Sequence, residues 1–214
     1  MVNRENLYRF LGRLYLEEID ATTLERLKVM RFPADGDDAA YSAGYKLLKE
    51  YLDTCGQSAL TELAADYAKV FLGAGSAQGP AAFPYESVYT SHQRIMMQDP
   101  RDQVMAIFAA KGLRKEDNVI SEDHIALLLS FMAFLCNESQ SVSDTHDSAG
   151  VIECLKAQKD FLEQHLLNWV PAFCADIENL ADTAFYKGVG KITDGYLRLD
   201  GAILDSLIDC SFMA

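Results

Sequence analysis

The most apolar stretch of the chain, Ile125–Cys136, has the sequence IALLLSFMAFLC, and it decides the fold class. Only Ser130 interrupts it, so a helix formed by these residues is apolar on every face. A helix that is apolar all round is typical of the centre of a helical bundle. The run is also shorter than the roughly 20 residues that a membrane-spanning helix needs. We therefore expect it to lie in a protein core, without stable insertion in a membrane.

Apolar residues also recur at helical spacing on both sides of this stretch. Leu7, Phe10, Leu11 and Leu14 follow the i, i+3, i+4, i+7 pattern of an amphipathic helix. Alternation of apolar and polar residues, which would predict a strand, never persists. The sequence therefore predicts an all-α fold, a single-domain bundle of about nine helices without internal repeats. Besides 125–136, we expect helices at about residues 3–18, from 22 onward, and at 41–52, 58–72, 92–96, 101–111, 151–180 and 203–208.

Short polar residues predict where three of these helices begin. Thr22 and Glu25 have the spacing of a capping box, in which each side chain satisfies a free backbone N–H group of the first turn. Ser58 and Ser121 stand just before apolar helical patterns, and serine is a preferred N-cap residue. We therefore expect all three N-termini to be capped by hydroxyl side chains.

Prolines, glycines and polar runs predict the breaks between helices. Pro100 should end one helical segment, because the residue before a proline avoids the helical conformation. Pro171 should kink or divide the helix at 151–180 near Trp169. The polar segment 137–148 is typical of a mobile surface loop, and Gly188–Gly190 of a turn.

The chain has 214 residues and half of them are hydrophobic, which suits one folded domain, residues 1–214. The glycine-rich loop 73–82 is a candidate hinge, so we expect either a monomer or a dimer that exchanges helices. Lys and Arg number 19 against 32 Asp and Glu, which gives a net charge of −13. A field of that sign disfavours nucleic-acid binding and attracts cations and basic peptides.

Cysteine usage and the start of the chain indicate the compartment. Cys55, Cys136, Cys154, Cys174 and Cys210 are scattered, odd in number and without CxxC spacing. This usage is typical of reduced, mostly buried thiols in a cytosolic protein. The first residues show no long apolar region of the kind that a signal peptide contains. We therefore expect a cytoplasmic location.

The first candidate site is Ser121-Glu122-Asp123-His124, directly before the apolar helix. Acidic residues at a helix N-terminus are typical of capping, because they interact favourably with the positive end of the helix dipole. Alternatively, His124 holds a neighbour or a ligand, and the dipole favours its neutral form. A catalytic role would require a nucleophile from elsewhere, and the chain has no G-x-S-x-G elbow.

The second candidate site is Pro84-Tyr85-Glu86-Ser87-Val88-Tyr89, directly after the glycine-rich loop. Tyr85 and Tyr89 offer rigid contact area with polar tips, and Glu86 is able to pair with an arginine guanidinium through two hydrogen bonds. The segment is therefore a candidate peptide-docking surface. In the alternative, Ser87 caps a helix and the tyrosines pack against its neighbours.

Motifs for metals, nucleotides and known catalytic sites are missing from the sequence. His92, His124, His146 and His165 never occur at HxxxH or HExxH spacing, and the chain has no P-loop. We therefore predict no catalytic residue, no metal and no cofactor. The enzyme hypothesis that stays open is a small hydrolase with Ser87 as nucleophile and His124 with Asp123 as its base.

The order of several short segments resembles the TorD/DmsD family of redox-enzyme maturation chaperones. The resemblance spans about residues 60–180 of an all-α chain of suitable length. Each segment is short, and their order along the chain makes the set specific. The matching segments are Tyr67–Gly73, Pro84–Tyr89, Glu122–Ile125 with Phe131 and Met132, and Gln158–Leu162 with His165, Leu166, Trp169 and Phe173.

The resemblance implies a fold, a function and a site. Family members are cytosolic all-α chaperones that bind the twin-arginine leader of a molybdopterin-containing oxidoreductase before export. They are thought to hold the apoenzyme until its cofactor is inserted. The family's Asp-His pair maps onto Asp123 and His124, and its aromatic stretch onto Pro84–Tyr89. Many members carry a proline near the Asp-His pair, where this chain has Ser121 and Glu122, and some carry tryptophan where it has tyrosine.

The chemistry of such a leader indicates what its receptor needs. A twin-arginine leader has a basic segment followed by an apolar one. A receptor for it needs partly desolvated carboxylates, for which Glu86, Glu122 and Asp123 are the candidates, and an apolar groove. We expect Tyr85 and Tyr89 to line that groove, which requires 84–89 and 121–124 to be neighbours in space. Besides the hydrolase, the alternative is a non-catalytic adaptor that binds a folded redox-enzyme subunit.

Overall fold

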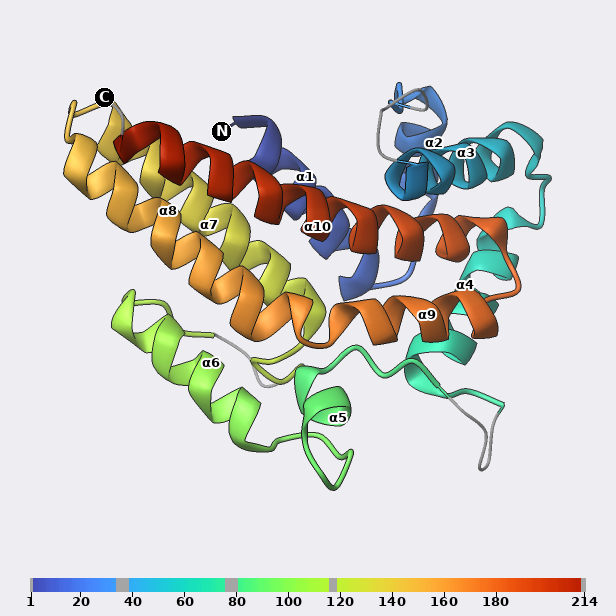
Figure 1. Cartoon of the computed structure of the whole chain (residues 1–214). Coiled ribbons are helices and arrows are strands. Elements are labelled where there is room, and N and C mark those ends of the chain that lie inside the picture. The colour runs from blue at the N-terminus through green and yellow to red at the C-terminus, as the bar shows by residue number, and fades with distance from the viewer. Residues whose placement is uncertain (1, 34–38, 76–80, 116–118, 213–214) are drawn as a thin grey trace. The chain divides into compact units, whose positions relative to one another are not determined.

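The computed structural model describes residues 2–33, 39–75, 81–115 and 119–212, and the regular structure in these ranges is helical (Figure 1). The described residues form ten α-helices and one five-residue π-helix, η1, and contain no strand. The predicted all-α fold is therefore confirmed. The helices are α1 (Val2–Leu16), α2 (Ala21–Val29), α3 (Ala39–Thr54), α4 (Ala59–Leu72), α5 (Glu86–Thr90), α6 (Asp99–Ala110), α7 (Ile125–Ser143), α8 (Ser148–Leu162), η1 (Glu163–Leu167), α9 (Val170–Leu180) and α10 (Ala184–Phe212).

The chain divides into two compact units, which we describe separately. Unit 1 comprises Met1–Tyr15, Tyr85–Trp169 and Leu197–Ala214, and unit 2 comprises Leu16–Pro84 and Val170–Tyr196. Helix α10 contributes its first part to unit 2 and its last part to unit 1. The single domain and the oligomeric state stay predictions. So does the hinge at 73–82, of which residues 76–80 lie outside the described residues.

Helix α7 forms the core of unit 1, as its composition predicts. Leu128, Leu129 and Met132 are fully buried, and α8 packs along α7 (Figure 1). By length and composition, α7 is also the one described helix that could cross a membrane. However, 56% of the most apolar 18-residue window of α7 is buried inside the protein, as expected for a core helix.

The predicted surface loop at 137–148 is wrong for 137–143, because α7 continues to Ser143; residues 144–147 do lie between α7 and α8. Ser139 Oγ and Ser141 Oγ donate hydrogen bonds to carbonyl oxygens three and four residues earlier in the same helix. Their hydroxyl groups are thereby satisfied without leaving the helical conformation. A run of serine and asparagine at the end of an apolar helix therefore does not break it.

A buried ion pair joins α1 to α10 within unit 1. Arg4 Nε and Nη2 lie 2.5 Å and 2.8 Å from the two carboxylate oxygens of Asp200, and Tyr8 Oη donates to the same carboxylate at 2.6 Å. Burial lowers the pKa of Arg4, but the hydrogen bond and the charge of Asp200 outweigh this effect and raise it. Arg4 therefore stays charged, and each member of the pair needs the other.

In unit 2, glycines let α3 and α10 approach each other closely. A Cβ atom added at Gly188 would lie 2.8 Å from the backbone oxygen of Gly44, which is closer than such atoms come. Gly188 is therefore a packing residue inside an uninterrupted α10, and the predicted turn at Gly188–Gly190 is wrong. The start of α10 is held by Asp66, whose carboxylate accepts hydrogen bonds from two backbone N–H groups there.

Two helix starts differ from the predicted caps. Asp20, rather than Thr22, caps α2, and its carboxylate accepts a hydrogen bond from Thr23 N at 2.6 Å. Aspartate is a better N-cap than threonine, which accounts for the difference. Ser58 does occupy the N-cap position of α4, but its side chain makes no capping bond, and its hydroxyl donates to Glu62 instead.

The predicted helical segment around 92–96 is also wrong. Residues 91–98 form a loop, in which Arg94 and Met97 have φ angles of 53° and 60°. Pro100 does not end a helix but lies in the first turn of α6. Proline suits that position, because an N–H group in the first turn has no partner within the helix. The loop therefore separates α5 from α6.

The predicted break near Trp169 is confirmed. Helix α9 begins at Val170, and Pro171 lies in its first turn. The proline thus starts a helix here as well, for the same reason as in α6.

The cysteines form no disulfide bond, as predicted. All five are free thiols, of which Cys136 and Cys174 are buried and Cys210 is exposed. The expectation that most of them are buried is wrong, because Cys55 and Cys154 are only half-buried.

Candidate functional site

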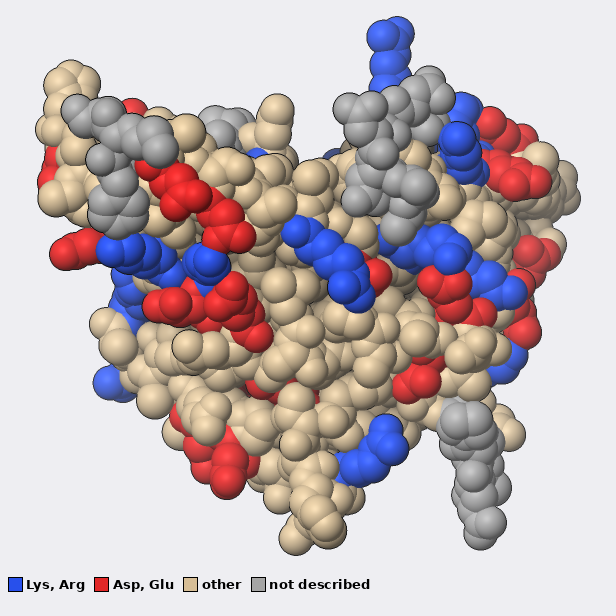
Figure 2. All heavy atoms as spheres, viewed as in Figure 1, with Lys and Arg blue, Asp and Glu red and all other residues tan. Residues whose placement is uncertain are grey.

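The net charge of −13 is not collected in one acidic patch on the face shown in Figure 2, where Lys and Arg lie among Asp and Glu. Exposed ion pairs such as Lys159 with Asp205 neutralise part of the charge. Such pairs contribute little to binding, because water screens them. A site that binds a cation specifically therefore requires a concavity in which water screens the charges less.

Unit 1 brings the two sequence candidates together. Tyr85 forms an isolated antiparallel bridge with His124, and Glu86 N donates to Asp123 O at 3.1 Å. Ser87 N donates to Asp123 Oδ2 at 2.9 Å. The predicted proximity of the two segments is therefore confirmed for 85–87 and 123–124.

Asp123 and His124 support the site from inside the protein. Asp123 is fully buried, and by binding Ser87 N it holds the first turn of α5. His124, rather than Ser121, is the N-cap of α7, and its Nδ1 accepts a hydrogen bond from Ala126 N at 3.1 Å. The cap lies three residues later than predicted because 121–123 turn toward α5 instead of entering α7.

His124 is neutral at physiological pH. Burial lowers its pKa to about 4, against a smaller raising effect from the charge of Asp123. Only an unprotonated Nδ1 accepts a hydrogen bond, so the low pKa and the capping geometry agree.

This low pKa predicts a stability that falls in mild acid. The unfolded chain takes up a proton on His124 near pH 6.5, whereas the folded chain does so only near pH 4. Neutral His124 therefore makes its full contribution to the free energy of unfolding above pH 6.5. This contribution is lost as the pH falls toward 4. Between pH 7 and 5 we expect a loss of about 2 kcal/mol in the free energy of unfolding.

Urea unfolding of the parent and of His124→Asn at both pH values measures this contribution. Asparagine is a good N-cap that does not titrate, so the variant should lose about 2 kcal/mol less on acidification. Equal losses in the two proteins would refute a buried neutral histidine.

Glu86 is the centre of a second buried cluster. Its Oε2 lies 3.0 Å from His165 Nδ1, and its Oε1 accepts a hydrogen bond from Asn168 Nδ2 at 3.0 Å. Glu86 is only 2% exposed. Trp169 Nε1 donates to His165 O at 2.8 Å, and the Trp169 ring packs against Tyr89 at 5.4 Å. This part of the chain therefore holds the carboxylate in a fixed position.

The π-helix η1 places these partners. It contains His165 and immediately precedes Asn168, and both side chains reach the same carboxylate. Single turns of π-helix occur frequently at functional sites. Sequence analysis did not single out Asn168 or Gln164, because their role depends on this local change of helical register.

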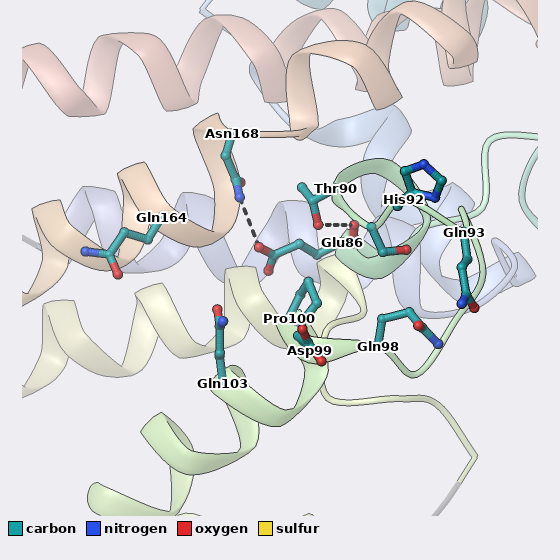
Figure 3. A pocket seen from close by; sticks show the side chains of 11 residues that line it. Glu86, Thr90, His92, Gln93, Gln98, Asp99, Pro100, Gln103, Gln164 and Asn168 are labelled. Atoms are coloured by element: carbon teal, nitrogen blue, oxygen red, sulfur yellow. Dashed lines mark hydrogen bonds between the residues drawn. The ribbon is translucent and has the colours of Figure 1, made fainter.

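A cavity of about 470 Å³ opens next to Glu86 (Figure 3). The described residues that line it include two carboxylates and no Lys or Arg, and most of the others carry amide or hydroxyl groups. Such a cavity suits a cation with several hydrogen-bond donors. The lining residues are Glu86, Thr90, Ser91, His92, Gln93, Gln98, Asp99, Pro100, Gln103, Gln164 and Asn168.

Neither Tyr85 nor Tyr89 lines this cavity, and the predicted groove between them stays a prediction. Tyr85 packs edge-on against His124 at 4.9 Å, and Tyr89 packs on Trp169. Aromatic pairing inside unit 1 thus covers part of each ring, and both tyrosines are half-buried. Pro84 is buried as the last residue of a unit 2 segment.

Of the three predicted carboxylates, Glu86 alone lines the cavity. Glu122 Oε2 instead accepts a hydrogen bond from Arg101 Nε at 2.8 Å. Burial raises the pKa of Glu122, but the hydrogen bond from Arg101, a backbone hydrogen bond and the nearby positive charges together outweigh this effect and lower it. Glu122 is therefore charged and already paired, and Asp99 of α6 is the second carboxylate of the cavity.

An apolar groove of about 270 Å³ lies elsewhere in unit 1, between α6 and α7. Its lining is mainly aromatic and aliphatic, with two basic residues. The residues are Phe108, Leu113, Arg114, Lys115, Leu127, Ser130, Phe131 and Phe134.

The geometry does not assemble the hydrolase that the sequence left open. Ser87 Oγ accepts a hydrogen bond from Gln98 N, and His124 Nδ1 from Ala126 N. No hydrogen bond joins Ser87 to His124 among the described residues, and Asp123 binds Ser87 N rather than the histidine ring. The described residues contain no cluster of three or more His, Cys, Asp or Glu residues that could hold a metal ion.

Comparison with known proteins places the chain in a family. The family model described as nitrate reductase delta subunit matches residues 34–175. A chaperone protein TorD from Vibrio cholerae serotype O1 is 32% identical, over 96% of this chain and 93% of that protein. The chain belongs to the TorD family of redox-enzyme maturation chaperones.

Other TorD chaperones match over nearly the same length. The protein from Shewanella pealeana is 27% identical over 95% of this chain and 90% of its own length, and that from Vibrio parahaemolyticus 24% over 94% of both. A solved redox enzyme maturation protein from Archaeoglobus fulgidus aligns with a TM-score of 0.48 and 16% identity, over 94% of this chain and 93% of that one. We draw no conclusion from this distant likeness. The TorD relatives confirm the family that the sequence motifs indicated.

Proposed function

We propose that this TorD-family chaperone binds the twin-arginine leader of a molybdopterin-containing oxidoreductase subunit. In this proposal it acts in the cytoplasm, without catalysis, and holds the apoenzyme for cofactor insertion before export. The cavity beside Glu86 receives a guanidinium group of the leader. The supporting observation is a buried carboxylate at the edge of a hydrophilic cavity whose described lining has no Lys or Arg.

The hydrogen-bonding capacity of Glu86 supports this role. Each oxygen of a carboxylate can accept two hydrogen bonds, and His165 and Asn168 use one on each. One position on each oxygen is left for a guanidinium, which donates two parallel N–H groups to a carboxylate. Removal from water makes such a pair stronger than one on an open surface.

Asp123 and His124 are positioning residues in this proposal. Asp123 binds the first turn of α5, and His124 pairs with Tyr85 just before it, so both help to hold Glu86. Neither of them lines the cavity. Replacing both with alanine should still weaken leader binding, because the first turn of α5 loses its support.

Calorimetric titration of the full chain with a synthetic twin-arginine leader tests the proposal. A control leader has both arginines replaced by glutamine. We expect the arginine leader to bind at least about tenfold more tightly, because two charge-assisted contacts are lost in the control. Equal binding of the two peptides would show that the arginines are not recognised.

The alternative adaptor role is favoured by the α6–α7 groove, whose Arg114 and Lys115 do not complement a basic leader. In that case the chain would bind a folded redox-enzyme subunit without its leader. Titration with the leaderless subunit distinguishes the two roles. Tight binding of that subunit, together with no binding of the leader, would support the adaptor.

A further inference from the structure

The loop between α5 and α6 exposes three consecutive large apolar side chains. Ile95 is 51% exposed, Met96 38% and Met97 66%. The loop stands out at the lower edge of Figure 1, where Figure 2 shows a projection of uncharged side chains. Grouped exposed apolar residues of this kind often mark an interaction surface.

The loop is held in this conformation by its own hydrogen bonds. Gln98 Nε2 donates to the carbonyl oxygens of Met96 and Met97, and Gln98 N donates to Ser87 Oγ. Arg94 and Met97 have positive φ, which costs residues other than glycine on the order of 1–2 kcal/mol each. Apolar exposure is unfavourable in the free protein, so a partner that covers these side chains would be favoured by burial of their apolar surface.

The same loop forms a wall of the cavity beside Glu86. His92, Gln93 and Gln98 line the cavity, and they flank the three exposed apolar residues in sequence (Figure 3). An anionic cavity and an apolar surface are therefore continuous along one loop of unit 1. That combination complements a peptide in which a basic segment is followed by an apolar one.

We infer that Ile95, Met96 and Met97 receive the apolar segment of the leader while its arginine occupies the cavity. This inference rests on the proposed function and names the second half of the same site. Methionine is unbranched and polarizable, so it adapts to apolar partners of different shape. Such a surface accepts leaders whose apolar segments differ in sequence.

The α6–α7 groove is less suited to the same segment. Gln103 lines the cavity and Phe108 lines the groove, both from α6. Five residues at about 100° each place these two positions about 140° apart around the helix. The groove therefore lies on the other flank of α6, and its Arg114 and Lys115 disfavour the basic end of a leader.

The test compares two synthetic peptides, the full twin-arginine leader and its basic half alone. With the parent protein the full leader should bind about tenfold more tightly or better, because apolar surface is buried. In Met96→Gln/Met97→Gln that difference should fall below about threefold, while the basic half binds as before. Met96→Leu/Met97→Leu should keep the parent's difference, because its side chains stay apolar.

A matched control is Met30→Gln, since Met30 is 45% exposed, belongs to unit 2 and lines no part of the cavity. Met30, Met96 and Met97 are exposed, and equal melting temperatures of all the variants would confirm folding. If Met96→Gln/Met97→Gln still binds the full leader as much more tightly than the basic half as the parent does, the inference is overturned. The proposal that the protein binds the leader would still stand. Loss of the difference in Leu113→Gln instead would assign the apolar segment to the α6–α7 groove. If the parent binds neither peptide, the proposed function itself is wrong.

Discussion

Replacing Asp200 with asparagine should lower the free energy of unfolding by about 3–5 kcal/mol. Asp200 is fully buried and binds both Arg4 and Tyr8 within unit 1. Asparagine keeps the shape and an acceptor for Tyr8 but removes the negative charge. Arg4 is then left as a buried cation without its counterion, which is the costly state. Chemical unfolding at neutral pH measures the effect.

Two further variants distinguish the effect of leaving Arg4 buried without the charge of Asp200 from the effect of any substitution in α10. Asp205 lies on α10, as Asp200 does, and Asp205→Asn breaks its exposed pair with Lys159 of α8. This change should alter stability by less than about 1 kcal/mol. Arg4→Met/Asp200→Leu replaces the buried pair with apolar side chains and should recover most of the lost stability. A loss below about 1 kcal/mol in Asp200→Asn would show that the pair is not a buried structural element.

Leader binding should weaken by about 30-fold in Glu86→Gln, which corresponds to about 2 kcal/mol. The glutamine oxygen is still able to accept a hydrogen bond from Asn168, so α5 and η1 should keep their positions. The variant lacks the charge that a guanidinium requires in a desolvated cavity. Calorimetric titration with the twin-arginine leader gives the change in affinity, and thermal melting verifies the fold.

Asp102→Asn is the matched control for Glu86→Gln. Asp102 is an exposed carboxylate of α6 that does not line the cavity. The variant also changes the net charge by one unit, so it reports general electrostatic attraction to the basic leader. We expect less than a threefold change, because water screens an exposed charge. Similar weakening in both variants would mean that total charge, rather than the cavity, determines binding.

The sequence was sufficient to predict the fold class, because the apolar run in α7 and the helical spacing elsewhere have only one consistent interpretation. The sequence was misleading where one residue type occurs in two different structural roles. Pro100 and Pro171 begin helices, although proline more often signals their end. Gly188 allows close packing of α10 on α3, although glycine more often signals a turn.

The candidate site was only partly predictable for a different reason. Glu86 stood out because it lies between two tyrosines directly after the glycine-rich loop, and Asp123 because it directly precedes the apolar helix with His124. The partners of Glu86, His165 and Asn168, are 79 and 82 residues away in the chain. No local sequence pattern indicates contacts between residues so far apart in the chain. The π-helical turn that permits them is not recognisable from apolar residues at α-helical spacing. The aromatic partners of Tyr85 and Tyr89, His124 and Trp169, also lie far from them in the chain, so local sequence patterns did not reveal these contacts.

A double-mutant cycle between Glu86 and the leader tests the central claim most directly. Parent protein and Glu86→Gln are each titrated with the twin-arginine leader and with leaders in which one or the other arginine is replaced by glutamine. If Glu86 receives a guanidinium, one arginine should show a coupling energy of about 1.5 kcal/mol or more with it. If the two changes add to within about 0.5 kcal/mol for both arginines, the cavity is not where the leader's charge is recognised.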